Sequence, residues 1–210
     1  MRIPKHLKFI RTKDKGRTLL ANRDIKKGEI ILKLKGIMKK CSEASVESVQ
    51  IDDDKFIDSK YYYPEDYINH SCDPNTKIDF KTMNFVALRN IKKGEEITYN
   101  YLTTEYDLVR DNLDFDCKCG SKNCFGRIKG FRFLTKSQKL KLKPLLSPFL
   151  KKKIGAPRLT PSLVSLARSR CALGLTPSGR LTQFMRKFAQ LANFPNFSPF
   201  GRKSSHKPIR

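Results

Sequence analysis

The chain has 210 residues, enough for one domain of ordinary size with an appendage and enough to bury a core without disulfides. Its 44 Lys and Arg outnumber its 20 Asp and Glu, which gives a formal net charge of +24. Residues 1–15 lack the apolar run of a secretory signal, and no stretch approaches the roughly 20 apolar residues of a membrane span. We therefore expect an intracellular protein with no membrane partner. It would be cytoplasmic in a prokaryote, and a nuclear location is compatible with a eukaryotic protein or with an effector that acts in a host cell.

The charge is unevenly distributed along the chain. Residues 131–210 carry 18 Lys and Arg and no acidic residue, whereas the first 130 residues carry 26 basic and 20 acidic residues, a net charge of +6. Such a field attracts nucleic acid, anionic membranes or acidic protein surfaces and does not determine the fold. Two interpretations of the basic end stay open: contacts with nucleic-acid phosphates, or a solvated terminus with no selected role.

Short apolar runs between polar turns predict a mainly β core. Such runs occur within residues 17–37, 80–88 and 97–101. The phrase DIKKGE at 24–29 nearly recurs as NIKKGE at 90–95. Six residues are too few for an internal repeat, so we interpret the two phrases as similar hairpin turns.

The C-terminal part of the chain has a weaker pattern. Thr135 can cap a helix that starts at Lys136, and Pro144 would kink or divide that helix. From residue 155 onward Pro, Ser, Asn and Arg prevail. We expect this basic tail to be disordered or only marginally helical by itself.

Three of the six cysteines have the spacing of metal ligands. Cys117, Cys119 and Cys124 form C-x-C-x4-C, and residues i and i+2 of an extended segment point to the same side. A closed structural zinc site needs four ligands, so one must come from elsewhere. The candidates are Cys41, Cys72, Cys171, His6, His70 and His206. We choose Cys72 because it lies in NHSCDPN at 69–75, the densest polar motif of the chain; the competing interpretation is buried or redox-active thiols.

Several strings, in matching order and spacing, resemble a SET domain followed by its post-SET zinc loop. They are NHSCDPN at 69–75, GEEITYNY at 94–101 and the cysteine run that ends in CFG at 124–126, while KGRTLLA at 15–21 resembles the first cofactor motif of the family. The resemblance covers about residues 5–130 and is to the compact prokaryotic and viral type without a pre-SET segment. It implies a mainly β, SET-domain β-clip fold with a pseudoknot, followed by the zinc-binding loop and a C-terminal helix.

The resemblance and the composition together imply four parts. We expect a SET domain over residues 1–101, a post-SET zinc segment over 102–130, a helical extension over 131–154 and the basic tail over 155–210. We expect the chain to act as a monomer.

The resemblance also implies roles for individual residues. Tyr101 matches the catalytic tyrosine, and Tyr99 matches the position that sets how many methyl groups are added; the competing interpretation for both is ordinary strand packing. The methyl donor S-adenosylmethionine would be held by Lys15, Gly16, Arg17, Thr18, Asn69, His70 and Ile128. For Asn69 and His70 both backbone and side chain would take part, and Ile128 would pack against the adenine. The structural zinc would be bound by Cys72, Cys117, Cys119 and Cys124.

The implied function is an S-adenosylmethionine-dependent protein-lysine N-methyltransferase. Its partner would be a basic protein that carries the target lysine, such as a histone-like, ribosomal or chromatin protein. An ordinary lysine pKa of about 10.4 leaves little free amine at neutral pH, but an apolar channel beside the sulfonium would lower it, so no dedicated base is strictly needed. A hydroxyl at Tyr99 leaves less room for a methylated amine, which predicts mono- or dimethylation.

The competing function is a catalytically weak SET-like binding protein that uses its basic tail on nucleic acid. Thr18 stands where the family usually has a second glycine, and this departure favours the alternative together with the tail. The presence of the tyrosine, the NH motif and all four cysteines argues against it. A plain zinc module for nucleic-acid recognition would need a recognition helix or interleaved aromatic residues, and Phe125 and Phe131 are not enough.

Overall fold

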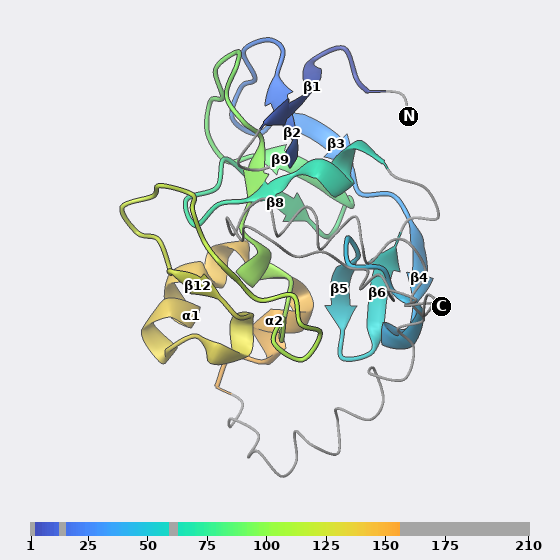
Figure 1. Cartoon of the computed structure of the whole chain (residues 1–210), viewed down its shortest axis with the longest axis vertical. Helices are drawn as coiled ribbons and strands as arrows, with labels where there is room; N and C mark the ends of the chain where they lie inside the picture. The colour runs from blue at the N-terminus through green and yellow to red at the C-terminus, as the bar shows by residue number, and fades with distance from the viewer. Residues whose placement is uncertain (1–2, 13–15, 59–62, 156–210) are drawn as a thin grey trace, which may run out of the picture.

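The described part of the computed structural model, residues 3–12, 16–58 and 63–155, is mainly β, as predicted (Figure 1). Its strands are β1 (Leu7–Thr12), β2 (Gly16–Ala21), β3 (Ile30–Lys33), β4 (Ile37–Lys39), β5 (Val49–Asp52), β6 (Lys55–Asp58), β7 (Asn69–His70), β8 (Thr76–Asp79), β9 (Asn84–Ala87), β10 (Thr98–Tyr99), β11 (Phe115–Asp116) and β12 (Arg127–Ile128). Its helices are α1 (Lys136–Leu142), α2 (Pro148–Lys152) and the 3-10 turns η1 (Cys41–Glu43), η2 (Pro64–Tyr67), η3 (Tyr101–Thr103), η4 (Phe131–Phe133) and η5 (Lys143–Leu145). No helix in these ranges is long and apolar enough to cross a membrane.

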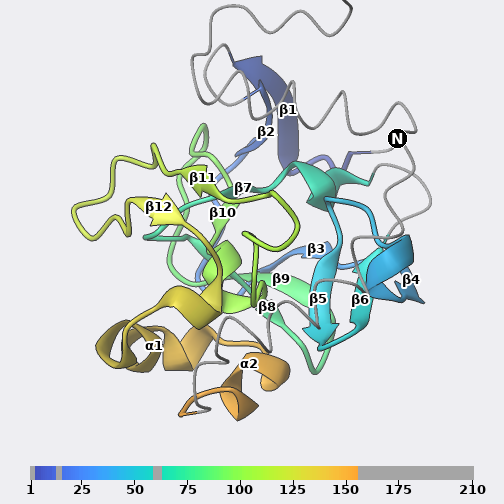
Figure 2. The same cartoon turned by 60° about the horizontal axis from the view of Figure 1, so that its bottom comes forward.

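The strands of the described residues form several small sheets. β1 and β2 form an antiparallel pair, β9 lies between β3 and β8, and β6 lies between β4 and β5. β7 and β10 pair in parallel, and β11 pairs with β12. Figure 2 shows β7, β10 and β11 close together at the middle of the molecule. Sequence-distant motifs therefore meet where these short strands lie side by side.

Two apolar clusters stabilise this arrangement. The first is formed by the strands of the β core, with Leu19, Phe85 and Ile97 almost fully buried. The second joins the segment after η3 to the C-terminal helices, and its fully buried members include Ile128 and Phe131. The C-terminal helices therefore pack against the cysteine-containing segment. Burial of each large apolar side chain stabilises the folded protein by about 1.5–3 kcal/mol.

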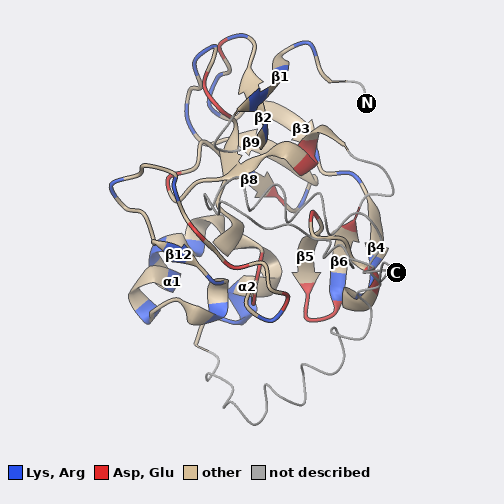
Figure 3. Cartoon of the chain, viewed as in Figure 1, with Lys and Arg blue, Asp and Glu red and all other residues tan. Residues whose placement is uncertain are grey.

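The helical extension follows its local sequence signals. The Thr135 hydroxyl accepts a hydrogen bond from Gln138 N at 3.2 Å, and the Gln138 side chain accepts one from Thr135 N at 2.8 Å, so Thr135 caps α1 as predicted. Pro144 lies in η5 and separates α1 from α2, also as predicted. Lysines coat the outer side of both helices, which appear blue in Figure 3.

Gly130 makes the sharp turn at the start of this extension. Its φ is +108°, a conformation that residues with a side chain rarely adopt, and a Cβ there would lie 2.7 Å from Tyr106 O. Only glycine therefore lets the chain pass so close to the preceding segment.

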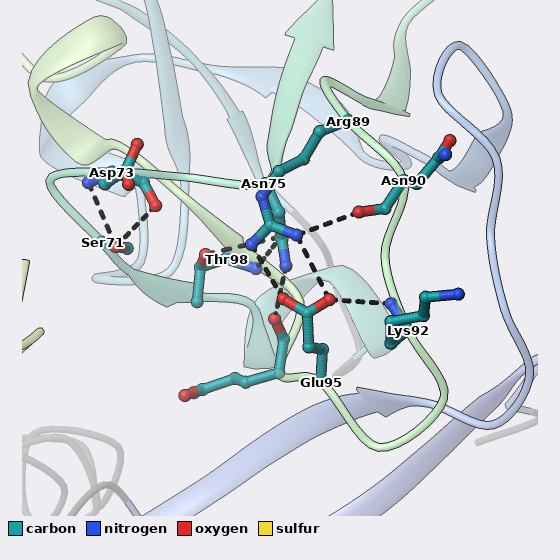
Figure 4. Close-up of polar contacts among 9 residues, drawn as sticks. Ser71, Asp73, Asn75, Arg89, Asn90, Lys92, Glu95 and Thr98 are labelled. Atoms are coloured by element: carbon teal, nitrogen blue, oxygen red, sulfur yellow. Dashed lines mark hydrogen bonds and ion pairs between the residues drawn. The ribbon is translucent and has the colours of Figure 1, made fainter.

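The two similar phrases form two similar turns that pack against each other. Ile25 and Ile91 exchange backbone hydrogen bonds of 2.8 and 2.9 Å, and both side chains are buried. In each phrase a preceding arginine pairs with the final glutamate, as Arg89 does with Glu95 at 2.8 Å (Figure 4). Glu95 also accepts a hydrogen bond from Lys92 N at 2.7 Å. The two turns therefore hold together the segments that follow β2 and β9.

Candidate active site and cysteine cluster

The parallel pairing of β7 with β10 brings the two most distinctive motifs together. Thr98 lies opposite Asn69, and Tyr99 lies opposite His70. The Ser71 N–H donates to Tyr99 O at 3.0 Å and extends the pairing by one residue. The NH motif and the tyrosine motif thus become neighbours although about thirty residues separate them in the sequence.

His70 connects this strand pair to the cysteines. Its Nδ1 accepts a hydrogen bond from Tyr101 N at 3.1 Å, which assigns the proton of the neutral ring to Nε2. Nε2 lies 3.3 Å from Cys72 Sγ and can donate to it. Both ring nitrogens therefore have partners within the protein. Of the groups of His70 that were expected to bind the methyl donor, only the backbone is left for that role.

Tyr101 is held in place from several sides. Its hydroxyl donates to Ile68 O at 3.0 Å, and its ring centroid lies 5.2 Å from that of His70 and 4.8 Å from that of Tyr99. Burial raises the pKa of both tyrosines above the ordinary value. Both hydroxyls consequently stay protonated at neutral pH and can donate hydrogen bonds.

Asn69 is oriented by a glutamate that the sequence analysis did not single out. Asn69 Nδ2 donates to Glu96 Oε1 at 2.9 Å, which turns Asn69 Oδ1, an acceptor, away from that carboxylate. Thr18 Oγ1 donates to the same Glu96 oxygen at 2.6 Å. Glu96 lies within the GEEITYNY string, and only the position of this string beside β2 and β7 reveals the contact.

Thr18 is accommodated without intruding on the surface of the site. Its side chain is 1% exposed and is directed to Glu96, so the methyl and hydroxyl groups are taken up by the core. The Thr18 side chain, which stands where the family usually has a glycine, thus has a hydrogen-bond partner in the protein. This departure is therefore weaker support for a loss of function than it is in the sequence alone.

The other residues expected to hold the donor are placed differently. Gly16 begins β2 with a φ of +68°, and Arg17 donates to the Tyr67 hydroxyl at 3.1 Å. Ile128 is fully buried in the second apolar cluster. Lys15 lies outside the described residues.

The structure brings four cysteines together. The sulfur atoms of Cys72, Cys117, Cys119 and Cys124 all lie within 4.8 Å of one another. Cys72 Sγ is 3.7 Å from Cys117 Sγ and 3.9 Å from Cys124 Sγ. Zn–S bonds of about 2.3 Å in a tetrahedron place sulfur atoms about 3.8 Å apart, so the group fits a tetrahedral zinc.

The chemistry of the four thiols also favours a cation. The hydrogen bond from Cys72 lowers the pKa of Cys117 to about 3, whereas the same contact and burial raise the pKa of Cys72. Ionising all four thiols so close together requires a positive charge between them. Phe125 N donates to Cys72 Sγ at 3.3 Å and Gly126 N donates to Cys124 Sγ at 3.4 Å, contacts that suit thiolates. Of the other fourth-ligand candidates, Cys171 and His206 lie outside the described residues.

A cavity of about 160 Å³ adjoins both the tyrosines and the cysteine segment. Its apolar wall includes Tyr99, Tyr101 and Phe115, and Lys118 is the one Lys or Arg among the residues that line it. Its acidic residues are Glu47, Glu65, Asp66, Glu105, Asp111 and Asp116. In a chain with a net charge of +24 the cavity is therefore an acidic region, suited to a cationic side chain.

Glu105 is the most perturbed of these carboxyl groups. Burial raises its pKa to about 7, although its carboxylate accepts a hydrogen bond from Gln50 N at 3.3 Å. It follows the catalytic candidate Tyr101 by one turn, and its own N–H donates to Tyr101 O at 2.8 Å. No motif in the sequence pointed to this residue, because its importance depends on what surrounds it.

Residues 16–102 match the SET domain family model, so the chain contains a SET domain and the predicted resemblance to that domain is confirmed. The chain is 34% identical over 140 residues to histone-lysine N-methyltransferase ASHH3 of Arabidopsis thaliana, a match that covers 57% of this chain and 37% of that protein. It is 40% identical over 70 residues to the H3 lysine-36 specific histone-lysine N-methyltransferase of Mycosarcoma maydis, covering 30% of this chain and 7% of that protein.

Among solved structures, KRYPTONITE in complex with mCHG DNA and SAH is similar, with a TM-score of 0.50 and 25% identity over 60% of this chain and 30% of that chain. The chain thus spans little more than a third of the first of these relatives.

The cysteine cluster predicts about one tightly bound Zn²⁺ per chain. We expect Cys124→Ser, which removes the most exposed of the four thiols, to reduce the zinc content of the purified protein to well below one per chain and to lower its melting temperature. Lys122→Ser serves as the control because Lys122 is exposed in the same loop but is not part of the cluster, and this variant should retain the metal. Zinc content is measured by plasma mass spectrometry; equal zinc in the Cys124 variant and its parent would exclude the site.

The raised pKa of Glu105 predicts a pH-dependent effect on stability. A carboxyl group that ionises less readily in the folded than in the unfolded state makes folding less favourable as the pH rises from about 4.5 to about 7. Glu105→Gln should therefore match its parent near pH 4 and exceed it by about 1–3 kcal/mol in free energy of unfolding at pH 8. Denaturant titrations at both pH values measure this difference, and a gap that is equal at pH 4 and pH 8 would contradict it. Glu43→Gln, at an exposed position outside the cavity, is the matched control.

Proposed function

We propose that the chain is an S-adenosylmethionine-dependent protein-lysine N-methyltransferase. The observation that carries the proposal is the position of Tyr101, which is fixed by His70 and Ile68 and faces a cavity of acidic and aromatic residues. The relatives named as histone-lysine methyltransferases support the same activity.

The methyl donor would bind where β2 approaches the NH motif. SAH, present with KRYPTONITE, is S-adenosylmethionine after loss of its methyl group, which supports this choice of donor. In this chain the backbone of Gly16–Thr18, the Asn69 amide oxygen and the backbone of His70 are the groups that suit it, and we include Lys15 in the proposal. When bound, the donor supplies an electrophilic methyl group on a positively charged sulfur. Glu96 would hold the Asn69 amide in one orientation by the bond to Nδ2.

The target lysine would enter the cavity from the side of Phe115 and reach the two tyrosines. The Tyr99 hydroxyl can donate a hydrogen bond, and the Tyr101 oxygen can accept one from the amine while its own proton is donated to Ile68 O. The two rings restrict the amine to a narrow approach. Alignment of the amine with the methyl group would supply much of the acceleration. The acidic residues around the entrance would attract a basic protein segment.

Zinc would have a structural role in this proposal. Cys117 follows β11, whose Phe115 ring packs edge-on against His70 at 5.7 Å and Tyr101 at 6.2 Å. Four thiolates on one ion would fix this strand to the segment of Cys72 and so complete the wall of the cavity.

The substrate class follows from charge. We propose a basic protein that presents a lysine, of the histone-like, ribosomal or chromatin kind, because the cavity is acidic within a strongly basic chain. The protein would act on it as a monomer inside the cell. The proposed contact of the basic tail with nucleic acid falls outside the described residues.

The activity is tested with a radiolabelled methyl donor and recombinant core histones. We expect the parent chain to transfer label to lysine, and Tyr101→Phe to reduce the rate at least a hundredfold because the hydroxyl and its bond to Ile68 O are lost. Donor binding measured by calorimetry should be retained by this variant. A Tyr101→Phe rate within a few-fold of the parent would remove Tyr101 from the proposed role. Donor binding without transfer by either protein would instead favour the catalytically weak binding protein.

The degree of methylation is tested at Tyr99. Its side chain is buried against Phe85 and Tyr101, with ring centroids 5.5 and 4.8 Å away, so its hydroxyl limits the space around the amine. We expect the parent to produce mono- and dimethyllysine and Tyr99→Phe to shift the products by at least one methyl group. Mass spectrometry of the products measures the shift; an unchanged distribution would show that another residue sets the limit.

A further inference from the structure

Glu105 is a carboxylate of the cavity that the proposed chemistry has not yet used. It lies on the same wall as Tyr99 and Tyr101, and Gln50 N holds its Oε1 at 3.3 Å. Gln50 is itself held, because its Oε1 accepts a hydrogen bond from Tyr106 N at 2.9 Å. The carboxylate is thus fixed between β5 and the end of η3.

Glu105 also differs from neighbouring carboxylates in its partners. Asp111 pairs with Arg110 at 2.9 Å, and Asp116 pairs with Arg127 at 3.3 Å. Within the part of the chain that the structure describes, Glu105 forms no ion pair, and its hydrogen-bond partners, Gln50 N and the Thr104 hydroxyl, are neutral groups. Burial beside an apolar channel destabilises the ionised form of a carboxyl group, and a bound cation offsets this cost.

We propose that Glu105 binds the ammonium group of the substrate lysine in the cavity and accepts one of its protons before methyl transfer. The inference deepens the proposed function and rests on it. It replaces the expectation that the channel needs no dedicated base with a specific proton acceptor.

The proposed sequence balances protons and electrons. The ammonium gives one proton to the Glu105 carboxylate, which becomes a neutral carboxyl group, and the amine is left with a free electron pair. That pair forms the new bond to the methyl carbon while the carbon–sulfur bond breaks and its electron pair stays on sulfur. The product is a methylated ammonium, and Glu105 returns its proton to water.

The charged groups around Glu105 agree with this role. Burial and, to a smaller extent, Asp111 raise its pKa to about 7, and Arg110 acts in the opposite direction. Tyr99 and Tyr101 face it as neutral hydroxyls, and the other titratable groups that line the cavity are Glu47, Glu65, Asp66, Asp116, Lys118 and His70 with the nearby cysteines. A carboxylate of this kind is half ionised near neutral pH, which is the range in which a general base works best.

The test compares the pH dependence of Glu105→Gln with that of the parent, with recombinant core histones as the substrate. Glutamine keeps the oxygen that accepts from Gln50 N but cannot take up a proton. We expect kcat/KM to fall about ten- to a hundredfold at pH 7, and the difference to shrink to under about threefold near pH 10, where lysine loses its proton to water unaided. Glu105→Asp should restore part of the rate.

A second measurement does not depend on turnover. A peptide around a histone lysine that the parent methylates is synthesised with lysine or with norleucine at that position, and both affinities are measured at pH 8 without the methyl donor. The parent should prefer lysine, and Glu105→Gln should reduce this preference about tenfold. Glu43→Gln removes the same charge outside the cavity and should leave both the pH profile and the preference unchanged.

The outcomes separate this inference from the proposed function. A loss of rate in Glu105→Gln that is equal at pH 7 and pH 10 would show a structural role and overturn the inference, as would an unchanged pH profile. An active parent in either case leaves the methyltransferase assignment intact. A parent that binds the donor but methylates no histone overturns both for this substrate class.

Discussion

One imidazole joins the two halves of the candidate site. His70 accepts from Tyr101 N on one ring nitrogen and faces Cys72 Sγ with the other, so the position of the tyrosine depends on the position of the cysteine cluster. Phe115, two residues before Cys117, packs against the same ring. A disturbance of the cluster would therefore reach Tyr101 through His70 and through Phe115, whose ring centroid lies 6.2 Å from that of Tyr101. The same geometry leaves neither nitrogen of the His70 ring free for a ligand.

Basic and acidic residues lie in different regions of the molecule, which the net charge alone does not indicate. Basic residues coat the outside of α1 and α2, whereas the β5–β6 tip and the cavity carry acidic side chains (Figure 3). Carboxylates that pair with arginines, such as Asp111, are neutralised locally, while Glu105 is held by the backbone N–H of Gln50. At the cavity a cationic ligand would thus meet an attractive field. The hydroxyls of the two tyrosines beside it remain uncharged.

The Thr18–Glu96–Asn69 contact shows how a departure from a family pattern can be compensated. In the sequence Thr18 counts against donor binding because a larger residue replaces a glycine. In the structure its hydroxyl shares the Glu96 oxygen that also orients Asn69, so the change adds a hydrogen bond to the group that positions the amide. The neighbouring Asn100 amide is only partly satisfied: its Oδ1 accepts from Leu102 N, whereas its Nδ2 is the one buried side-chain polar atom of the described residues without a partner.

The sequence alone determined the features that depend on near neighbours. The mainly β class, the twin turns, the Thr135 cap and the break at Pro144 follow from patterns within a few residues, because turn and cap hydrogen bonds are local. The motif strings also identified the SET domain. The NHSCDPN motif also led to the choice of Cys72, whose sulfur lies with those of the three clustered cysteines. Tertiary structure decided other contacts between distant segments: that Glu96 holds Asn69, and that Glu105 faces the cavity. No local pattern encodes these, since each depends on segments that only the parallel β7–β10 pair and the second apolar cluster bring together.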